Sequence, residues 1–521
     1  VEPAAVSLID GVTGSGKTEV YFEAIAELMR REPEAQILVL LPEIALTQAV
    51  TKRFRDRFGV EPALWHSGLA DKDRRRTWRE VASGRARIVA GARSSIFLPF
   101  THLRGIVVDE EHDPTYKQDE NLTYNARDLA VARAKLQGAA CILASATPSL
   151  ESLVNAEAGR YVHVVLPSRA GGAVLPDIEL LDLRVSPPEK GEWLSPPLHK
   201  AVAETLARGE QAMLYLNRRG FAPLVLCKAC GHKMKSPEAD RWLVEHRYTG
   251  RLVCHVTGFS MPKPKACPEC GEPDSLIGVG PGVERVAEEA RQRFPEARVE
   301  VFSSDTAQTG DDVRSIVQRM EDGEIDILVG TQMLTKGLDF DNVTVVGVLN
   351  ADNMLNFPDF RAHERSFQLM QQVSGRAGRT EERGKVLIQT YNPYHNILQQ
   401  VSTNNYIDMF NEQMNDRYNF KYPPVYKQIK ITLKHKDYNR VETASIWLAK
   451  SLRQVFQDNV LGPESPPISR IRNQFHKNIL VKIPKKQSLA KTKEAIIKIN
   501  NSFSSIKDFR SVRVILNVDN F

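Results

Sequence analysis

The chain has 521 residues, of which 42% are hydrophobic and 26% are charged, and it is long enough for several globular domains. This composition excludes a disordered, collagen-like or coiled-coil protein, and the apolar runs are too short to cross a membrane. The net charge of +6 is too small to indicate nucleic-acid binding by itself. The N-terminal segment VEPAAVSLID has neither the basic region nor the apolar core of a signal peptide.

The first third of the chain alternates short apolar runs with amphipathic stretches. Buried parallel strands are predicted at AVSLIDG, QILVLLP, ARIVAGA, GIVVDEE and ACILASA. Patterns such as residues 19–30 predict helices that pack on the resulting sheet. This alternation is typical of a doubly wound α/β domain.

A Pro-rich connector over 166–197 leads into a second alternation of the same kind. It is interrupted by a cysteine-rich segment and followed by an α+β mixture that includes IKITLKH, ASIWLAKSLRQVF, NILVKIP and VRVILNV. We therefore expect a first α/β lobe at 1–165, the connector and start of a second lobe at 166–223, a metal-held insertion at 224–280, the rest of the second lobe at 281–391, and a small α+β domain at 392–521.

The segment GVTGSGKT, which begins at Gly11, matches the phosphate-binding loop pattern between a predicted strand and a predicted helix. Its glycines let successive backbone N–H groups turn toward a phosphate at the positive end of the helix. Lys17 supplies positive charge for the β- and γ-phosphates, and Thr18 supplies a hydroxyl for Mg²⁺. The expected nucleotide-binding residues are Gly11, Thr13, Gly14, Ser15, Gly16, Lys17 and Thr18.

An acidic motif, Asp109 to His112, directly follows the apolar run GIVV. In a chain with a phosphate-binding loop, two carboxylates at the end of a parallel strand indicate nucleotide hydrolysis. Asp109 is expected to hold Mg²⁺ through water, and Glu110 to orient and deprotonate the attacking water. These two features alone indicate an ATPase or GTPase of unspecified type.

Three further motifs follow in order: SATP at 145–148, GTQMLTKGLDF at 330–340 and QVSGRAGR at 372–379. The ordered set is similar to that of superfamily-two helicases, in which two RecA-like lobes clamp ATP between them. The resemblance implies that Arg376 and Arg379 stabilise charge on the γ-phosphate across the cleft. It further implies that Gln372 completes this motif and that Gly337 and Asp339 belong to the ATP site.

Longer segments resemble the primosomal replication-restart helicases, the PriA family, over essentially the whole chain. They include LLPEIALTQ, HSGL, GARSSIFLPF, DEEHDPTYKQ, YNARDLAVARA, LNRRGFAP and NFPDFRAHERSFQLMQQVSGRAGR. The resemblance implies a zinc-binding insertion in the second lobe and movement from 3′ to 5′ on single-stranded DNA at forks. It also implies a monomer in the bacterial cytoplasm, at the nucleoid, that engages other primosome proteins and single-stranded-DNA-binding protein and no membrane.

Tyr116 and Tyr124 fall in the segment that corresponds to the aromatic-rich loop of that family. Stacking of bases on aromatic rings tolerates any sequence, which suits a translocating motor. Arg93 and Lys336 are the other expected DNA contacts. For either tyrosine, ordinary packing in the protein interior is the alternative.

Two features set this chain apart from its family. Family members carry a further DNA-binding region ahead of the phosphate-binding loop, and we expect it to be absent here because the loop begins at residue 11. Residues 1–300 contain 28 Arg, 12 Lys and 4 Asn, whereas residues 386–521 contain 7 Arg, 14 Lys and 15 Asn. We interpret this shift as the mark of a chimera, so the alternative function is a module that binds DNA or partner proteins without motor activity.

Five of the six cysteines lie between Cys227 and Cys270, which indicates a metal site rather than disulfides. The pairs Cys227/Cys230 and Cys267/Cys270 provide four thiolates for tetrahedral zinc. The family pattern has four such pairs and two zinc ions, the first pair sharing an ion with the fourth. We expect one zinc here, and a more mobile loop over 236–257, because the inner positions are Ser236, Ala239, Cys254 and Thr257. Cys254 is then the residual ligand of a lost site, unless His232 or His255 substitutes for the missing thiolates.

Overall fold

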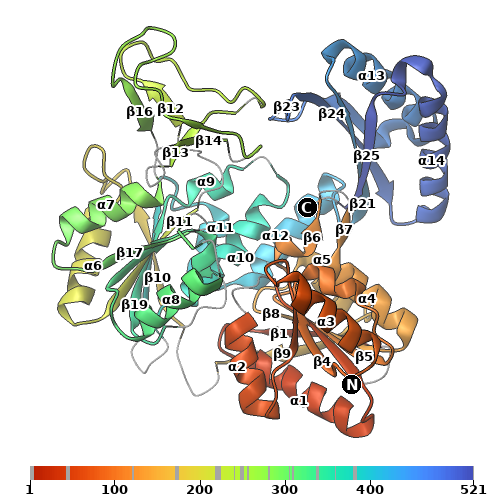
Figure 1. Cartoon of the computed structure of the whole chain (residues 1–521), viewed down its shortest axis with the longest axis horizontal. Helices are drawn as coiled ribbons and strands as arrows, with labels where there is room; N and C mark the ends of the chain where they lie inside the picture. Colours follow the sequence, from red (N-terminus) through yellow and green to blue (C-terminus); the bar gives the residue numbers. More distant parts are fainter. Residues whose placement is uncertain are drawn as a thin grey trace. The chain divides into compact units, whose positions relative to one another are not determined.

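Figure 1 presents the chain as a computed structural model. The backbone contacts divide it into two compact units, Val1–Asn217 with Arg285–Phe410, and Arg218–Glu284 with Asn411–Phe521. Among the helices of the described residues, none is both long and apolar enough to cross a bilayer. The structure describes residues 5–42, 47–119, 122–169, 175–217, 224–239, 241–246, 251–254, 257–279, 282–303, 306–307, 310–335, 340–357, 359–378 and 384–519.

The first lobe, red to orange in Figure 1, is built on a seven-stranded parallel sheet with the order β3-β4-β2-β5-β8-β1-β9. The five strands predicted here are confirmed as β1, β2, β4, β5 and β8, and the predicted helix is α1. The strands are β1 Val6–Gly11, β2 Gln36–Leu40, β3 Ala63–Trp65, β4 Ile88–Gly91, β5 Leu103–Asp109, β8 Ala140–Ser145 and β9 Val162–Leu166. The helices are α1 Lys17–Arg31, α2 Thr47–Phe58, α3 Asp71–Ala82, α4 Ala126–Gln137 and α5 Leu150–Glu157.

Helices cover both faces of this sheet, because successive side chains of a strand point to opposite sides. Ile37 and Val39 of β2 share a buried cluster with Phe22 of α1 and Phe54 of α2. Leu38, between them, is fully buried on the other face, where α4 packs on β5 and β8. The lobe is therefore doubly wound, as the alternation of the sequence predicted.

The second lobe has a six-stranded parallel sheet with the order β10-β20-β19-β11-β18-β17. The edge strand β10 of this lobe lies inside the segment predicted as a connector. The strand was not recognised in the sequence because it begins and ends with an aspartate and its side chains are mostly partly exposed. The strands are β10 Asp177–Asp182, β11 Gln211–Leu216, β17 Val299–Phe302, β18 Ile327–Gly330, β19 Val343–Leu349 and β20 Lys385–Thr390. The helices are α6 Pro196–Ala207, α7 Val283–Arg293, α8 Gly310–Glu321, α9 Asp352–Leu355, α10 Ala362–Ser374 and α11 Asn396–Ser402.

The other compact unit contains the cysteine-rich insertion and the C-terminal domain. The insertion consists of two small antiparallel sheets. Their strands are β12 Leu224–Cys227 and β16 Leu276–Val279 in one, and β13 Val244–His246, β14 Arg251–Val253 and β15 Ser260–Pro262 in the other.

The C-terminal domain is an antiparallel sheet packed against two helices, which confirms the expected α+β class. Helix α11 packs on α10 and β10 of the second lobe, and the backbone contacts place Asn411–Phe521 in the unit described here, so α12 begins in one unit and ends in the other. The strands are β21 Tyr426–His435, β22 Val460–Glu464, β23 Arg470–Ile471, β24 Gln474–Pro484 and β25 Arg513–Val518. The helices are α12 Tyr406–Asn419, α13 Tyr438–Phe456 and α14 Leu489–Ser505.

Candidate active site and metal centre

The glycine-rich loop joins β1 to α1. Gly14 and Gly16 have φ angles of 81° and 85°, a conformation that side chains with a Cβ rarely adopt. At Gly11 a Cβ would lie 2.5 Å from Ser15 Oγ and 2.9 Å from Leu166 Cβ. The glycines therefore let the loop curl around the N-terminus of α1, where backbone N–H groups favour an anion.

Two polar groups at this loop suit phosphate oxygens. The Lys17 ammonium is held over the loop, because Nζ donates hydrogen bonds to Gly11 O at 2.8 Å and Val12 O at 3.3 Å. The buried hydroxyl of Ser15 has no hydrogen-bond partner among the described residues, which is unusual for a buried polar atom. Thr18 lies in the first turn of α1 with its hydroxyl 3.4 Å from Arg53 Nη1. The predicted loop residues thus form a cradle that fits a nucleoside triphosphate.

Asp109 is the last residue of β5. Its carboxylate accepts hydrogen bonds from the Tyr21 hydroxyl at 3.2 Å and from Glu110 N at 3.0 Å. Burial, and secondarily the neighbouring Glu110 carboxylate, raises the pKa of Asp109 to about 6, while Lys17 acts in the opposite direction. A cation such as Mg²⁺ would relieve this penalty, so the residue fits its predicted role.

Glu110 has a φ angle of 47°, a left-handed conformation that is uncommon for a residue with a side chain and is often found at functional sites. Its Oε2 atom is buried without a hydrogen bond from the described residues, although His112 Nδ1 lies 3.6 Å away. A carboxylate oxygen that is not committed to the protein is available to accept a proton from water.

His112 connects the acidic motif to two other motifs. Its Nε2 accepts a hydrogen bond from the Gln372 amide at 2.8 Å, and its Nδ1 donates to Ser145 Oγ at 2.7 Å. Ser145 Oγ also accepts from Thr147 N at 3.0 Å. Since Gln372 lies on α10 of the second lobe, this chain of hydrogen bonds joins the two lobes directly beside Glu110.

The arginine motif after α10 also reaches the phosphate-binding loop. A Cβ on Gly375 would lie 2.8 Å from Thr13 Cγ2, and Arg376 beside it is buried. Arg379, Lys336, Gly337 and Asp339 lie outside the described residues. The sequence interpretation missed Arg169, which follows β9, donates to Gly378 O at 3.1 Å and approaches Gly14. Its position just after a strand, in SRAGG, was the available signal.

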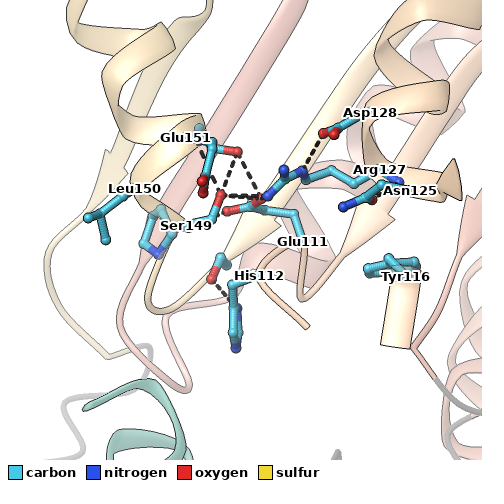
Figure 2. Close-up of polar contacts among 12 residues, drawn as sticks. Glu111, His112, Tyr116, Asn125, Arg127, Asp128, Ser149, Leu150 and Glu151 are labelled. Atoms are coloured by element: carbon cyan, nitrogen blue, oxygen red, sulfur yellow. Dashed lines mark hydrogen bonds and ion pairs between the residues drawn. The ribbon is translucent and has the colours of Figure 1, made fainter. Parts of the chain in front are cut away.

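The third carboxylate of the acidic motif, Glu111, takes part in a buried network of polar contacts inside the first lobe (Figure 2). Its fully buried carboxylate accepts hydrogen bonds from Ser149 N at 2.6 Å, Ser149 Oγ at 3.0 Å and Ser152 Oγ at 2.8 Å, and lies 3.3 Å from Arg127 Nη1. Burial works against the charge of Arg127, but Asp128 and Glu111 raise its pKa above the usual range. The network fixes the chain just after the C-terminal end of β5 relative to the starts of α4 and α5.

Helix α5 also meets the second lobe. Arg361 pairs with Glu151 at 2.7 Å, and Glu364 Oε1 accepts from Leu150 N at 3.1 Å. The Tyr406 hydroxyl donates to Pro148 O at 2.7 Å. The segment after β8 therefore contacts Arg361, Glu364 and Tyr406 of the same compact unit, and the motifs alone did not reveal these contacts.

The predicted DNA contacts separate into buried and exposed groups. Tyr116 is 1% exposed, and its hydroxyl donates to Leu40 O at 3.0 Å and Asp109 O at 2.6 Å. The prediction that it stacks on bases is therefore wrong for this conformation, because the packing alternative accounts for the ring. Arg93 donates to Thr115 O and Lys117 O at 3.0 Å each, so it holds the neighbouring loop.

Tyr124 is partly exposed and packs edge-on against Phe97, with ring centroids 5.0 Å apart. Phe97 ends the short 3₁₀ helix η2, Arg93–Phe97, and is 49% exposed. The sequence analysis named GARSSIFLPF only as a segment that resembles the family and did not single out Phe97, although such an exposed ring is the kind on which a base stacks. The pair Phe97/Tyr124 is therefore an aromatic surface of this lobe beside the acidic-motif loop, whereas the exposed Trp78 lies on α3.

The four predicted zinc ligands come together. All four sulfur atoms of Cys227, Cys230, Cys267 and Cys270 lie within 4.8 Å of one another. Cys227 Sγ lies 3.7 Å from Cys270 Sγ, and Cys230 Sγ lies 3.7 Å from Cys267 Sγ. Sulfurs bound at about 2.3 Å around a tetrahedral zinc are about 3.8 Å apart. The cluster therefore has the size of a zinc site.

The inner positions have a different environment. Ser236 is 1% exposed, and Ala239 and Cys254 are fully buried, the last two in one apolar cluster with Leu243 and Leu252. The greater mobility expected of the loop over 236–257 stays a prediction, because residues 240, 247–250 and 255–256 lie outside the described residues. His232 lies beside the outer site, with Nδ1 3.8 Å from Glu269 Oε2, and His255 lies outside the described residues.

Two parallel sheets of this topology, with a phosphate-binding loop, an acidic strand end and an arginine motif that meet between them, define a two-lobe ATP-dependent helicase. Family models agree with this class. The model described as DEAD/DEAH box helicase matches residues 4–156, and that of the helicase conserved C-terminal domain matches 272–381. The model of the primosomal protein N C-terminal domain matches 418–520.

The relatives identify the family. The replication restart protein PriA of Rickettsia felis is 40% identical over 488 residues, which are 93% of this chain and 74% of that protein. PriA of Bacillus subtilis is 40% identical over 93% of this chain and 60% of its own, and PriA of Haemophilus influenzae is 37% identical over 99% and 69%. A structure of RecG bound to a three-way DNA junction covers 80% of this chain and 44% of its own at 16% identity and a TM-score of 0.46. The chain belongs to the PriA family of replication restart proteins.

Proposed function

We propose that this chain uses ATP and Mg²⁺ to move from 3′ to 5′ along single-stranded DNA and to unwind duplex at stalled or repaired replication forks. The observation that supports a motor most directly is the hydrogen-bond chain from Gln372 through His112 to Ser145. It lies beside the proposed base, Glu110, and spans both lobes. A change of charge at the nucleotide is therefore in a position to alter the contact between lobes.

Each residue at the nucleotide has a distinct role in this proposal. Lys17 compensates phosphate charge, and Thr18 and Asp109 hold Mg²⁺, whose positive charge stabilises the phosphate oxygens. Glu110 orients the attacking water and accepts its proton. Arg376 and Arg379 stabilise the charge that develops on the phosphate, and Gly337 and Asp339 complete the nucleotide site from the second lobe.

We place single-stranded DNA against Phe97 and Tyr124, with Lys336 as a further contact and Arg93 as the residue that positions the loop. An exposed ring pair supplies stacking without reading the sequence. Partners by family are forked DNA, other primosome proteins and single-stranded-DNA-binding protein. We propose that the protein acts as a monomer in the bacterial cytoplasm, at the nucleoid, with one zinc ion in the Cys227/Cys230/Cys267/Cys270 site.

The alternative, a truncated or chimeric module that binds DNA or partners without motor activity, is not favoured. Such a module has no need of a phosphate-binding loop, and here Thr13 contacts Gly375 of the arginine motif. The nucleotide-binding elements of both lobes have therefore kept their mutual fit.

The direction of movement can be tested on duplexes that carry one single-stranded tail. We expect ATP-dependent strand displacement from a 3′-tailed duplex and little from a 5′-tailed one. Glu110→Gln is the matched control, because it keeps the shape of the side chain and removes the base. Equal displacement on both tails, or a preference for the 5′ tail, would contradict the proposed direction.

A further inference from the structure

The cysteine-rich insertion contains four copies of one backbone turn, which we call knuckles and number along the chain. Each knuckle has two positions with the spacing of a CxxC pair, which we call its first and second ligand positions. The residue at the first ligand position donates its N–H to the carbonyl five residues later. The four hydrogen bonds join residues 227 and 232 at 2.8 Å, 236 and 241 at 2.8 Å, 254 and 259 at 2.8 Å, and 267 and 272 at 2.9 Å.

The flanking pairing repeats with the same spacing. In every knuckle the residue before the first ligand position forms an antiparallel bridge to the residue seven positions further on. These pairs are Leu226 with Lys233, Lys235 with Trp242, Val253 with Ser260, and Ala266 with Pro273. In the first, third and fourth knuckles a glycine with a φ angle of 75° or 76° closes the turn: Gly231, Gly258 and Gly271.

Cysteine occupies both ligand positions in the first and fourth knuckles only. The corresponding residues are Ser236 and Ala239 in the second knuckle, and Cys254 and Thr257 in the third. The second and third knuckles therefore share these hydrogen bonds and bridges with the outer knuckles, although only one of their four ligand positions is a cysteine. Neither an alanine nor a neutral hydroxyl is a useful ligand for zinc.

The hydroxyls replace the sulfurs in the hydrogen bonds of the turn itself. In the outer knuckles, the sulfurs of Cys227, Cys230 and Cys270 each accept a hydrogen bond from the backbone two residues later. Ser236 Oγ accepts in the same way from Glu238 N at 3.3 Å, and Thr257 Oγ1 from Phe259 N at 3.2 Å. The turns are therefore capped by side chains that need no metal.

Apolar packing replaces the remaining role of an ion, which is to hold two knuckles together. Ala239 of the second knuckle and Cys254 of the third are both fully buried and belong to one cluster with Leu243 and Leu252. The same cluster includes Cys227 and Cys267, the first ligand positions of the outer knuckles. Partly buried Phe259 and Met261 pack against this cluster. A small side chain at 239 leaves room for this packing, whereas a charged thiolate there would need a cation.

We propose that the second and third knuckles form a metal-free counterpart of the outer zinc site, held by hydroxyl caps and apolar packing, and that three cysteines convert it into a second zinc site. This inference rests on the proposed zinc ion in the outer pair. According to this inference, the inner knuckles keep their structure without a metal ion, whereas the missing cysteines alone suggest that they become mobile.

The test is the number of zinc ions per chain, measured by elemental analysis of purified protein. We expect one ion in the wild-type chain and two in the triple variant Ser236→Cys, Ala239→Cys, Thr257→Cys. Ser236→Cys alone is the matched control and should stay at one, because two thiolates do not complete a tetrahedral site. No additional ion in the triple variant, or two ions in the wild-type chain, would overturn the inference.

A zinc-free wild-type chain would instead contradict the outer site, so the two proposals fail separately. If the triple variant is insoluble, Co²⁺ titration of the metal-free wild-type chain and of Cys254→Ser decides the matter. One equivalent with tetrathiolate absorption in both proteins supports a metal-free inner pair. A second equivalent in the wild-type chain that disappears in Cys254→Ser would contradict it.

Discussion

Replacing Glu111 by alanine should destabilise the first lobe strongly, although Glu111 takes no part in the proposed chemistry. The carboxylate has no exposed surface and is surrounded by Arg127, Ser149 N and the hydroxyls of Ser149 and Ser152. Its removal takes away the buried carboxylate partner of Arg127, whose guanidinium is only 5% exposed, and leaves the more exposed Asp128 carboxylate 2.8 Å from Arg127 Nε.

Breaking a buried ion pair by removing one partner costs about 3–5 kcal/mol. In a lobe of this size, each kcal/mol lowers the unfolding midpoint by about 2–4 °C. We therefore expect Glu111→Ala to lower the midpoint of the first lobe by about 6–20 °C. Glu110→Ala is the matched control, because Glu110 Oε2 has no hydrogen bond among the described residues and its loss should cost less than about 1 kcal/mol.

Thermal unfolding monitored by proteolysis of the first lobe distinguishes these outcomes. Glu110→Ala should unfold near the wild-type midpoint and lose ATP hydrolysis, and Glu111→Ala should unfold well below it. An unchanged midpoint for Glu111→Ala would refute the network as a source of stability. Equal losses in both variants would mean that the two neighbouring carboxylates have not been correctly distinguished.

Three further variants or conditions test individual residues. Because the pKa of Asp109 is raised to about 6, ATP hydrolysis at limiting Mg²⁺ should fall as the pH drops through 6, and excess Mg²⁺ should move this fall to lower pH; a profile insensitive to Mg²⁺ would contradict the ligand assignment. Arg376→Ala should lower kcat by about 10³ and spare nucleotide binding, and a kcat near wild type would exclude it as the arginine finger. Phe97→Ala should weaken single-stranded DNA binding by about 1–3 kcal/mol, whereas the exposed but separate Trp78→Ala should not; equal effects would remove the case for the Phe97/Tyr124 surface.

The sequence was most informative where a chemical requirement fixes both residue type and spacing. The glycines and Lys17 of the loop, Asp109 at a strand end and the two outer CxxC pairs all lie where their patterns predicted. Periodicity located the buried strands of both lobes for the same reason, since a strand covered on both faces is apolar throughout. The edge strand β10 escaped detection because it is only half covered.

The features that the sequence did not reveal depend on which parts of the chain contact one another in the fold. Nothing in the sequence distinguishes Tyr116, whose hydroxyl bonds to two carbonyls inside the lobe, from the exposed Phe97. Arg169 was hidden because its contact, Gly378 O, is more than 200 residues away along the chain. The missing cysteines indicated a lost second zinc site, but they did not reveal that Ser236 Oγ and Thr257 Oγ1 accept backbone hydrogen bonds in these turns.

The most direct test of the motor is the rate of ATP hydrolysis by this chain with and without single-stranded DNA. We expect hydrolysis that requires Mg²⁺, rises when DNA is added and is abolished in Glu110→Gln while ATP binding persists. Hydrolysis at the same rate with and without DNA would contradict coupling between the nucleotide site and the DNA. Hydrolysis by Glu110→Gln at the wild-type rate would contradict the site itself.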